Sequence, residues 1–433
     1  MLKKINTTKK NFLNNLEFLL DKRRTYVPKK HTLVKRIIKE VKKNGNKAII
    51  KYEKKFNNYK KLEIRNLKYT DKEIKNIIKK LNKKTKKSID LAYRRIFNFH
   101  KNQKFKSYKM IDSHNNNFSY ISSPIERVGI YVPGGKASYP STVLMNSIPA
   151  IVAGVNEIYM TTPSSKKIFN PAVIYAAKKC GIKEIYKVGG AQAIAGMTFG
   201  TSVIKKVNKI VGPGNEYVAM AKKEVFGIVG IDMIAGPSEV TVVADKFSNP
   251  EWIAADLIAQ SEHDEQSQSI LISNSEKTIS KINSSLKKQL MSLKKRKIAL
   301  KSLKNFGIAI LSKTSKKIPM IINTIAPEHL EICTKNPELI LKNVKNAGSI
   351  FLGNYSPEAM GDYIAGPNHV LPTTGSAKFS SGLSVYDFLK RHSVIKISKS
   401  GIERLGPSVI NLSQYENLDG HAYSVKIRLK RKK

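Results

Sequence analysis

Cysteine is nearly absent from this chain, and its absence excludes two kinds of architecture. The 433 residues include 2 Cys, Cys180 and Cys333, which lie far apart and belong to no CxxC pair. Two isolated cysteines support neither a disulfide framework nor a zinc ribbon. We therefore interpret both as small apolar side chains of the interior.

Long hydrophobic runs are missing as well. No stretch of the sequence approaches the roughly 20 consecutive apolar residues that a membrane span needs. The N-terminal segment is basic but holds no apolar core followed by small residues, and Glu17 and Asp21 interrupt it. The sequence thus predicts neither a signal peptide nor a transit peptide, no membrane partner, and a location in the cytoplasm.

Acidic residues are scarce, with 32 Asp and Glu against 78 Lys and Arg and a formal net charge of +46. A basic excess of this size brings nucleic-acid binding into consideration. The lysines are spread over helix-like segments such as 75–87 and 287–301, without interleaved aromatic side chains or a zinc finger. We expect no specific nucleic-acid partner, and at most weak polyanion binding by the basic C-terminal segment 426–433.

The length and the hydrophobic pattern predict two or three domains of the α/β class. Residues 1–120 are typical of a helical N-terminal region, part of which can pack on the second α/β domain, with helices expected at 32–56 and 71–101. From about residue 121, short apolar strands alternate with helical patterns, which is the signature of βαβ units and parallel sheets.

Two such α/β blocks follow one another and are followed by a tail. The first, 121–234, has strands expected at 128–132, 157–161, 184–188 and 207–211. The second, 235–378, begins at the tight turn 235–238 and has strands expected at 239–244, 269–273, 307–311 and 349–352. The succession indicates a duplicated sheet plan. In the tail, 379–433, we expect a strand at 394–397, a helix from 408 and a last strand at 423–429.

Glycine-containing turns follow three strands of the first block. They are Pro133-Gly134-Gly135, Gly189-Gly190 and Gly212-Pro213-Gly214-Asn215. Glycines at the carboxyl ends of parallel strands let backbone N–H groups approach a phosphate at a helix N-terminus. None of the turns is a G-x-G-x-x-G fingerprint, so a purely geometric role for these glycines stays open.

Polar residues able to bind a metal accumulate in the second half of the chain. Gln260 and His263 are three residues apart near the end of an expected helix, a spacing that places both on one face. Together with Asp362 and His421 they offer two imidazole nitrogens and two oxygens, a set that zinc accepts. The alternative is that each of these side chains is merely hydrogen-bonded.

Glu328 and His329 are adjacent and follow Pro327, which holds the preceding Ala326 away from helical geometry. Neighbouring residues of an extended strand face opposite sides, so the two serve one centre only if the chain bends there. In that case the imidazole suits proton removal near neutral pH and the carboxylate suits activation of a water. The competing interpretation is a helix-start Glu with an exposed His.

Five longer motifs carry a family resemblance: VGPGNEYVAMAK from Val211, IDMIAGPSEV from Ile231, AQSEHDEQSQ from Ala259, IAPEHLEI from Ile325 and AGPNHVLPT from Ala365. In this order, and over about 19–429, the chain resembles the histidinol dehydrogenase family. The resemblance implies two related incomplete Rossmann-like parallel-sheet domains with a helical N-terminal and a small C-terminal segment. It also implies a cytoplasmic homodimer that oxidises L-histidinol through L-histidinaldehyde to L-histidine, in a four-electron reaction with two NAD and one Zn²⁺ per subunit.

The resemblance also assigns roles to individual residues. Glu328 matches the residue that activates water and His329 the general base. The implied zinc ligands are Gln260, His263, Asp362 and His421, with His421 reaching the partner subunit's site through the 379–433 dimerisation segment. Further implied substrate contacts are Ser238, His369 and Glu416, and the implied NAD contacts are Tyr131, Gln192 and Asn215.

Other functions remain open on the sequence alone. A relative with the same zinc and NAD sites can oxidise another amino or sulfonated alcohol, because pocket shape decides that choice. A zinc hydrolase with Glu328 as base would need no glycine-rich turns near Tyr131 and Asn215. A nucleic-acid-binding protein would show salt-sensitive DNA retention and no turnover.

Overall fold

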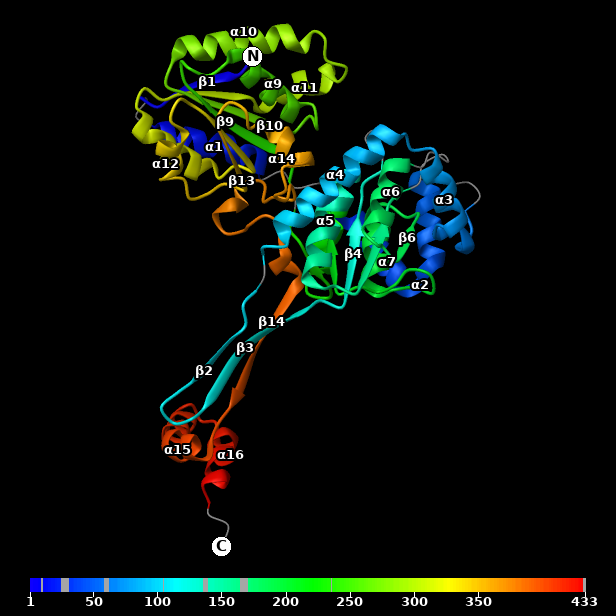
Figure 1. Cartoon of the computed structure of the whole chain (residues 1–433), viewed down its shortest axis with the longest axis vertical. Coiled ribbons are helices and arrows are strands. Elements are labelled where there is room, and N and C mark those ends of the chain that lie inside the picture. Colours follow the sequence, from blue (N-terminus) through cyan, green and yellow to red (C-terminus); the bar gives the residue numbers. More distant parts are fainter. Residues whose placement is uncertain are drawn as a thin grey trace.

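The computed structural model describes residues 1–8, 11–24, 31–57, 62–103, 105–134, 139–163, 170–234 and 236–430. Gly135 and Ala235, which belong to two of the turns expected above, lie outside these ranges, as does the end of the basic segment 426–433. The chain forms two α/β domains and a long arm that projects from them and ends in two helices (Figure 1). Within the described ranges, no helix is long and apolar enough to cross a membrane.

The first α/β domain is built on a five-stranded parallel sheet in the order β6-β5-β4-β7-β8. Its strands are β4 (Arg127–Tyr131), β5 (Glu157–Thr161), β6 (Glu184–Tyr186), β7 (Lys209–Val211) and β8 (Gly230–Ile231). One core cluster joins the sheet to α3 (Asp71–Lys79), α4 (Lys83–His100), α5 (Pro140–Ala153) and α6 (Pro171–Lys179). A second joins it to α2 (His31–Asn57), α7 (Gly190–Phe199) and α8 (Glu216–Val225). Helices therefore bury apolar side chains of the sheet in two separate cores.

The second α/β domain repeats this plan. Its strands are β9 (Glu239–Ala244), β10 (Gln268–Ser273), β11 (Ile308–Leu311), β12 (His329–Cys333), β13 (Ser349–Leu352) and the N-terminal β1 (Lys3–Asn6). The parallel order is β1-β11-β10-β9-β12-β13, so β9 to β13 are arranged as β4 to β8 are in the first sheet. Its helices are α1 (Phe12–Arg24), α9 (Pro250–Ser261), α10 (Glu276–Leu290), α11 (Arg296–Phe306), α12 (Ile318–Ile325), α13 (Pro337–Leu341) and α14 (Glu358–Tyr363). The shared strand order supports duplication of one sheet plan, and the expected fold class is confirmed.

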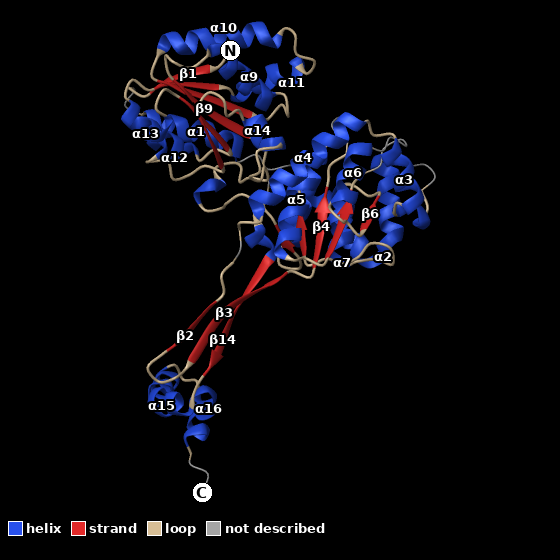
Figure 2. Cartoon of the chain, viewed as in Figure 1, coloured by secondary structure: helices blue, strands red, loops and turns tan. Residues whose placement is uncertain are grey.

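The arm is an antiparallel sheet of β2 (Tyr108–Ile111), β3 (Asn117–Pro124) and β14 (Leu389–Lys396), in the order β14-β3-β2 (Figure 2). It leads to α15 (Lys399–Tyr415) and α16 (Asp419–Leu429), which pack on each other at its far end (Figure 1). Several large apolar side chains of these elements are exposed, among them Ile395, Leu412, Tyr415 and Tyr423.

Local chemistry explains where many elements begin. Asn249 precedes α9 and its side chain accepts from the N–H groups of Glu251 and Trp252, while Pro250 fits the first helical position. Thr70 and Glu73 form a capping box at the start of α3. Four short 3₁₀ turns complete the described elements: Ile64–Leu67, Ser315–Lys317, Ser376–Lys378 and Val385–Phe388.

Some sequence expectations are wrong in detail. The helix expected at 71–101 is two helices, because Asn82 caps a new one. Residues 1–120 are not all helical, since β1, β2 and part of β3 fall there. Residues 423–429 belong to helix α16 and not to a strand, because Val425 and Leu429 pack against Gly406 of α15. Strand β12 is not among the strands that the sequence predicts.

Candidate active site

Glu328 and His329 lie at the amino end of β12, where the chain makes a sharp turn. Helix α12 ends at Ile325, and Ala326 adopts a left-handed conformation with φ of 49°, which is uncommon for a residue other than glycine. His329 then opens the strand, and Glu328 and His329 are only 6% and 4% exposed. The interpretation as a helix-start Glu with an exposed His is therefore wrong.

The backbone of Glu239 holds both side chains. Its N–H donates to Oε2 of Glu328 at 2.8 Å, and Nδ1 of His329 donates to its carbonyl at 3.1 Å. Because Nδ1 carries the donated proton, Nε2 is left as the basic nitrogen of His329. Glu328 and His329 also approach each other, with 3.8 Å between Oε2 and Nδ1.

Burial sets the protonation of this pair. Desolvation lowers the pKa of His329 to about 4, although the charge of Asp362 opposes the shift. Desolvation likewise raises the pKa of Glu328 well above its usual range, with the neighbouring Glu239 and Asp362 adding to the effect. At neutral pH the imidazole is consequently a free base, shielded from water.

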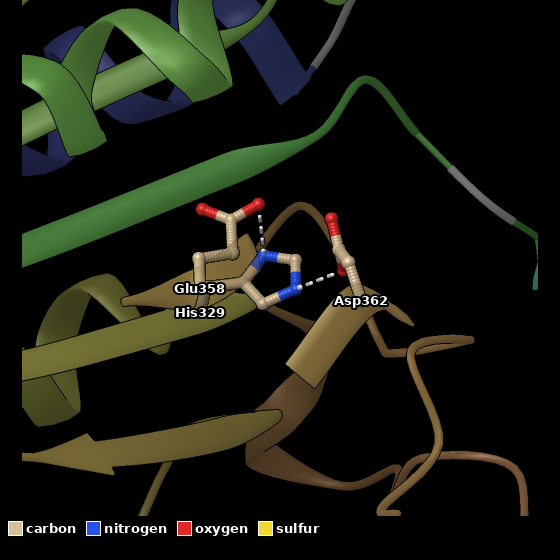
Figure 3. A group of neighbouring side chains, drawn as sticks. All are labelled: His329, Glu358 and Asp362. Atoms are coloured by element: carbon tan, nitrogen blue, oxygen red, sulfur yellow. Dashed lines mark ion pairs between the residues drawn. The ribbon is translucent and has the colours of Figure 1, made fainter. Parts of the chain in front are cut away.

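Helix α14 places two carboxylates around the His329 ring (Figure 3). Oε1 of Glu358 lies 3.5 Å from Nδ1, and Oδ1 of Asp362 lies 3.8 Å from Nε2. Glu358 and Asp362 are four residues apart, a spacing that puts both on one helix face. The ligand atoms of these three side chains all lie within 4.8 Å of one another, so they can share one metal ion.

Gln260 joins this group from the last turn of α9. It is fully buried and, with its amide nitrogen toward Glu358, donates to Oε1 and Oε2 at 2.9 and 3.0 Å. That orientation leaves its carbonyl oxygen available to a cation. His263 follows the helix end and is exposed, yet its charge lowers the pKa of both His329 and His369.

His369 faces the same carboxylate from another segment. Its Nδ1 donates to the carbonyl of Asp362 at 2.9 Å and lies 3.9 Å from Oδ1 of that residue. Ser238 directly precedes β9, and its carbonyl accepts from the guanidinium of the buried Arg23 at 3.2 Å. The structure thus brings Glu328, His329, Asp362 and His369 together with Gln260.

Glu416 and His421 are not part of this cluster within the chain. Glu416 caps α15 and His421 lies in α16, so both sit at the far end of the arm, away from the α/β domains (Figure 1). Both residues are exposed.

Tyr131, Gln192 and Asn215 lie at the carboxyl edge of the first sheet. The Tyr131 hydroxyl accepts from the N–H of Gly190 at 3.1 Å, and burial raises the pKa of this phenol to about 12. Nε2 of Gln192 donates to Oε1 of Glu53 at 2.8 Å. Asn215 caps α8 by accepting from two backbone N–H groups of its first turn. These residues therefore surround the amino ends of α7 and α8.

Gly212 shows that this edge demands glycine for a geometric reason. Its φ is +114°, and a Cβ there would lie 2.2 Å from the carbonyl oxygen of Tyr131. Its N–H donates to Asp232 at 2.8 Å, and Lys222, which pairs with Asp232, donates to its carbonyl at 3.0 Å. The turn is thus held on both sides by a buried ion pair.

Three supporting residues escaped the sequence interpretation. Glu358 was detectable as the partner of Asp362 at i,i+4 spacing. Arg23 and Glu53 come from N-terminal helices that only the tertiary fold brings to the two sites. Arg23 donates to Glu239 at 2.5 Å, and Glu53 accepts from Gly189 at 2.9 Å.

Comparisons with known proteins show the family of this chain. A family model described as histidinol dehydrogenase matches residues 20–429. The chain is 56% identical over 433 residues to histidinol dehydrogenase of Pelagibacter ubique, covering 100% of both, and 48% identical over 398 residues to that of Clostridium acetobutylicum, covering 92% of each. The crystal structure of histidinol dehydrogenase from Elizabethkingia anophelis superposes with a TM-score of 0.92 at 37% identity, covering 99% of this chain and 98% of that one. With its motifs, its fold and its buried Glu-His pair, the chain belongs to the histidinol dehydrogenase family of oxidoreductases.

Proposed function

We propose that this protein oxidises L-histidinol through L-histidinaldehyde to L-histidine, in a four-electron reaction with two NAD and one Zn²⁺ per subunit. The observation that carries the proposal is the buried Glu328–His329 pair, which is held by the backbone of Glu239 beside Asp362. Histidine biosynthesis in the cytoplasm is the corresponding role.

The donor chemistry of the cluster fits zinc. Gln260, Asp362 and His263 offer an amide oxygen, a carboxylate and an imidazole, and His421 of the partner subunit would complete four ligands. When bound, the ion would hold the imidazole and amino nitrogens of the substrate. His329 and Glu358 form a rival donor set with Asp362, but in the proposed reaction the free Nε2 of His329 accepts the proton of the alcohol, and Glu358 accepts from the Gln260 amide.

The carboxyl edge of the first sheet fits a dinucleotide. The amino ends of α7 and α8 lie at this edge, where helix dipoles favour an anion, and Gly212 keeps the backbone clear of side chains. We propose that Tyr131, Gln192 and Asn215 hold NAD, which would accept the hydride in each of the two oxidations. On this view 121–234 is the NAD-binding domain and 235–378 the metal and catalytic domain.

The chain's own residues divide the proton transfers. Nε2 of His329, free of the proton that Nδ1 shares with Glu239, accepts the proton of the alcohol. Glu328 accepts a proton from the water that adds to the aldehyde, and burial makes its carboxylate a stronger base. Ser238, His369 and Glu416 of the partner subunit would orient the substrate.

The position of the arm supports the proposal of a homodimer. Three proposed ligands lie in the second domain, whereas the fourth, His421, sits at the tip of the arm (Figure 1). The arm helices expose Leu412 (62%), Tyr415 (88%) and Tyr423 (58%), a concentration that suits a protein interface. We propose that each arm, including residues 379–433, completes the site of its partner.

Absorbance of NADH formed from histidinol tests the function directly. We expect two NADH for each histidinol consumed, histidine as the product, and loss of turnover with a zinc chelator that is reversed by added Zn²⁺. Turnover of another amino or sulfonated alcohol in preference to histidinol would replace the substrate assignment. Hydrolysis without NAD reduction would overturn the dehydrogenase assignment.

A further inference from the structure

The segment 364–371 belongs by sequence to the second domain but is anchored on the first. It follows α14 directly, and Val370 is buried in the core cluster that contains Val143 and Leu144 of α5, with Ile364 packed against the same cluster. Arg95 of α4 donates to the carbonyl of Ile364 at 2.6 Å. The segment is thus a strap between the two domains.

Glycine allows the strap to lie this close to the first domain. Gly366 has a φ of +126°, and a Cβ there would lie 3.0 Å from the Cβ of Phe99 in α4. Any other residue would be strained at this φ and would push the strap away from the helix.

Asn368 makes the most specific contact of the strap. Its Nδ2 donates to the carbonyl of Met145 at 2.6 Å, and its Oδ1 accepts from the N–H of Val370 at 2.9 Å. The residue is 8% exposed. One amide therefore fixes the local bend of the strap and ties it to α5.

The carbonyl of Met145 lacks a partner inside α5 because of a proline. Pro149 lies inside this helix and has no N–H for the carbonyl four residues earlier, which is that of Met145. A buried carbonyl without a donor is costly. Asn368 supplies the donor from the other domain.

The neighbouring residue faces the active site. His369 follows Asn368, and its Nδ1 donates to the carbonyl of Asp362 at 2.9 Å. Asp362 in turn lies 3.8 Å from His329. A displacement of Asn368 relative to α5 would consequently move the substrate-side residues relative to the first domain.

We propose that Asn368 is a positioning residue, which through the Met145 carbonyl freed by Pro149 locks the substrate-holding segment to the NAD-binding domain. The inference rests on the proposed function, in which the substrate and NAD are held by different domains. Hydride transfer needs both within reach, and a misplacement of about 1 Å can cost roughly 100-fold in rate.

Two variants separate an effect on positioning from an effect on stability. The first removes the hydrogen bond from Asn368 to Met145, and the second also gives the Met145 carbonyl a new donor. In Asn368→Leu the Met145 carbonyl loses its partner, so we expect a lower melting temperature and a kcat for histidinol reduced roughly 10–100-fold. In the double variant Asn368→Leu/Pro149→Ala the substituted alanine brings a backbone N–H that can serve that carbonyl, so the melting temperature should recover while kcat stays low. Recovery of kcat together with stability would overturn the proposal, because Asn368 would then only satisfy a carbonyl.

A distance measurement reports the lock independently of activity. Spin labels at Ser88→Cys in α4 and Ser284→Cys in α10 are both exposed and mark the two domains, while Cys180 and Cys333 are buried. We expect pulsed electron paramagnetic resonance to give a narrow distance distribution in the wild type and a broad one in both Asn368 variants. An unchanged distribution and kcat in Asn368→Leu would overturn the lock, even if histidinol oxidation by the wild type is confirmed.

Two further variants keep the test interpretable. Asn368→Asp retains the oxygen that accepts from Val370 and loses the donor to Met145, so it should resemble the Leu variant if that one fails to fold. Asn323→Leu is the matched control, since Asn323 donates to Asn343 at 2.9 Å and accepts from Lys345 at 2.7 Å within the second domain. It should lower stability without broadening the distribution or reducing kcat.

Discussion

The two α/β domains share one strand order but carry their proposed functional residues at opposite edges of the sheet. In the first domain, Tyr131 ends β4 and Gly212 follows β7, at the carboxyl edge. In the second, Ser238 precedes β9 and Glu328 precedes β12, at the amino edge. A duplicated plan has therefore produced two kinds of site.

Helix direction explains why the edges differ in chemistry. In a βαβ unit the helix runs back against the strands, so the carboxyl edge meets helix N-termini and the amino edge meets helix C-termini. N-termini favour anions and C-termini favour cations. The glycine-rich edge near α7 and α8 suits phosphate, and the edge where α9 ends, one residue after Gln260, suits a metal ion.

The largest expected effects come from the two bases of the amino edge. His329→Asn should reduce histidinol oxidation by roughly 10²–10⁴-fold, since the alcohol proton loses its acceptor. Glu328→Gln should spare alcohol oxidation in part and cripple oxidation of the aldehyde, which needs an activated water. Single-turnover assays of each half-reaction check the division, and equal loss of both steps in both variants would refute it.

Removing a proposed metal ligand tests whether the amino edge of the second sheet binds a cation. His263→Ala or Asp362→Ala should lower zinc content and kcat/KM together by at least about tenfold, because the proposed ion would also hold the substrate. Metal analysis beside the kinetics is the measurement. Full zinc occupancy with normal turnover in either variant would remove that residue from the ligand set.

A subunit-mixing experiment asks whether the amino edge is complete within one chain. A heterodimer of His421→Ala and Glu328→Gln subunits should regain about half of wild-type activity, since both defects then fall in one of two composite sites. Tagged heterodimers purified after mixing provide the measurement. Absence of recovery would mean that His421 serves its own subunit.

The smallest effect is expected at the carboxyl edge of the first sheet. There Glu53 of α2 accepts hydrogen bonds from the side chain of Gln192 and the N–H of Gly189. Burial raises the pKa of Glu53 above its ordinary 4.5, so the folded state holds this proton more tightly than the unfolded state. Wild-type stability should then fall as pH rises from 4.5 through the raised pKa, and Glu53→Gln should lose that slope. Urea unfolding across this pH range measures it.

The same variant probes NAD affinity. Glu53→Gln replaces a charged acceptor by a neutral one, so KM for NAD should rise about threefold with little change in kcat. Glu40→Gln, in the same helix but paired with Lys51 at its surface, is the control and should change neither quantity. A drop in kcat with an unchanged KM would place Glu53 in a different role.

From the sequence, four strands of each parallel sheet were predicted, whereas β8 of the first sheet and β1 and β12 of the second were missed. Strand β9 reads EVTVVA and was recognised, whereas β12 reads HLEIC and buries a histidine and a glutamate. Only the surrounding carboxylates, backbone donors and helices make such burial tolerable, and these come from distant parts of the chain. The local sequence pattern therefore did not predict the strand that carries the candidate site.

The strand predicted at 423–429 was wrong because the sequence pattern there fits two structures. Their alternation of apolar and polar side chains is typical of a strand, but Val425 and Leu429 are also one helical turn apart and meet Gly406 of α15. Packing against a neighbouring helix decided between two patterns that the sequence supports equally. The site residues themselves were recognisable from the family motifs, while their supports Arg23 and Glu53 were not.

The pairing of β1 with β11 sets an order in which the molecule can be assembled. Lys3 pairs with Ile308, and in the arm Asn117 pairs with Lys396, so β1 and β3 each wait for a partner strand that is synthesised much later. The first sheet has no such wait, because β4 to β8 lie within 127–231. During synthesis it can form while Lys3–Asn6 is still an unpaired edge, and the arm closes only after both domains have left the ribosome.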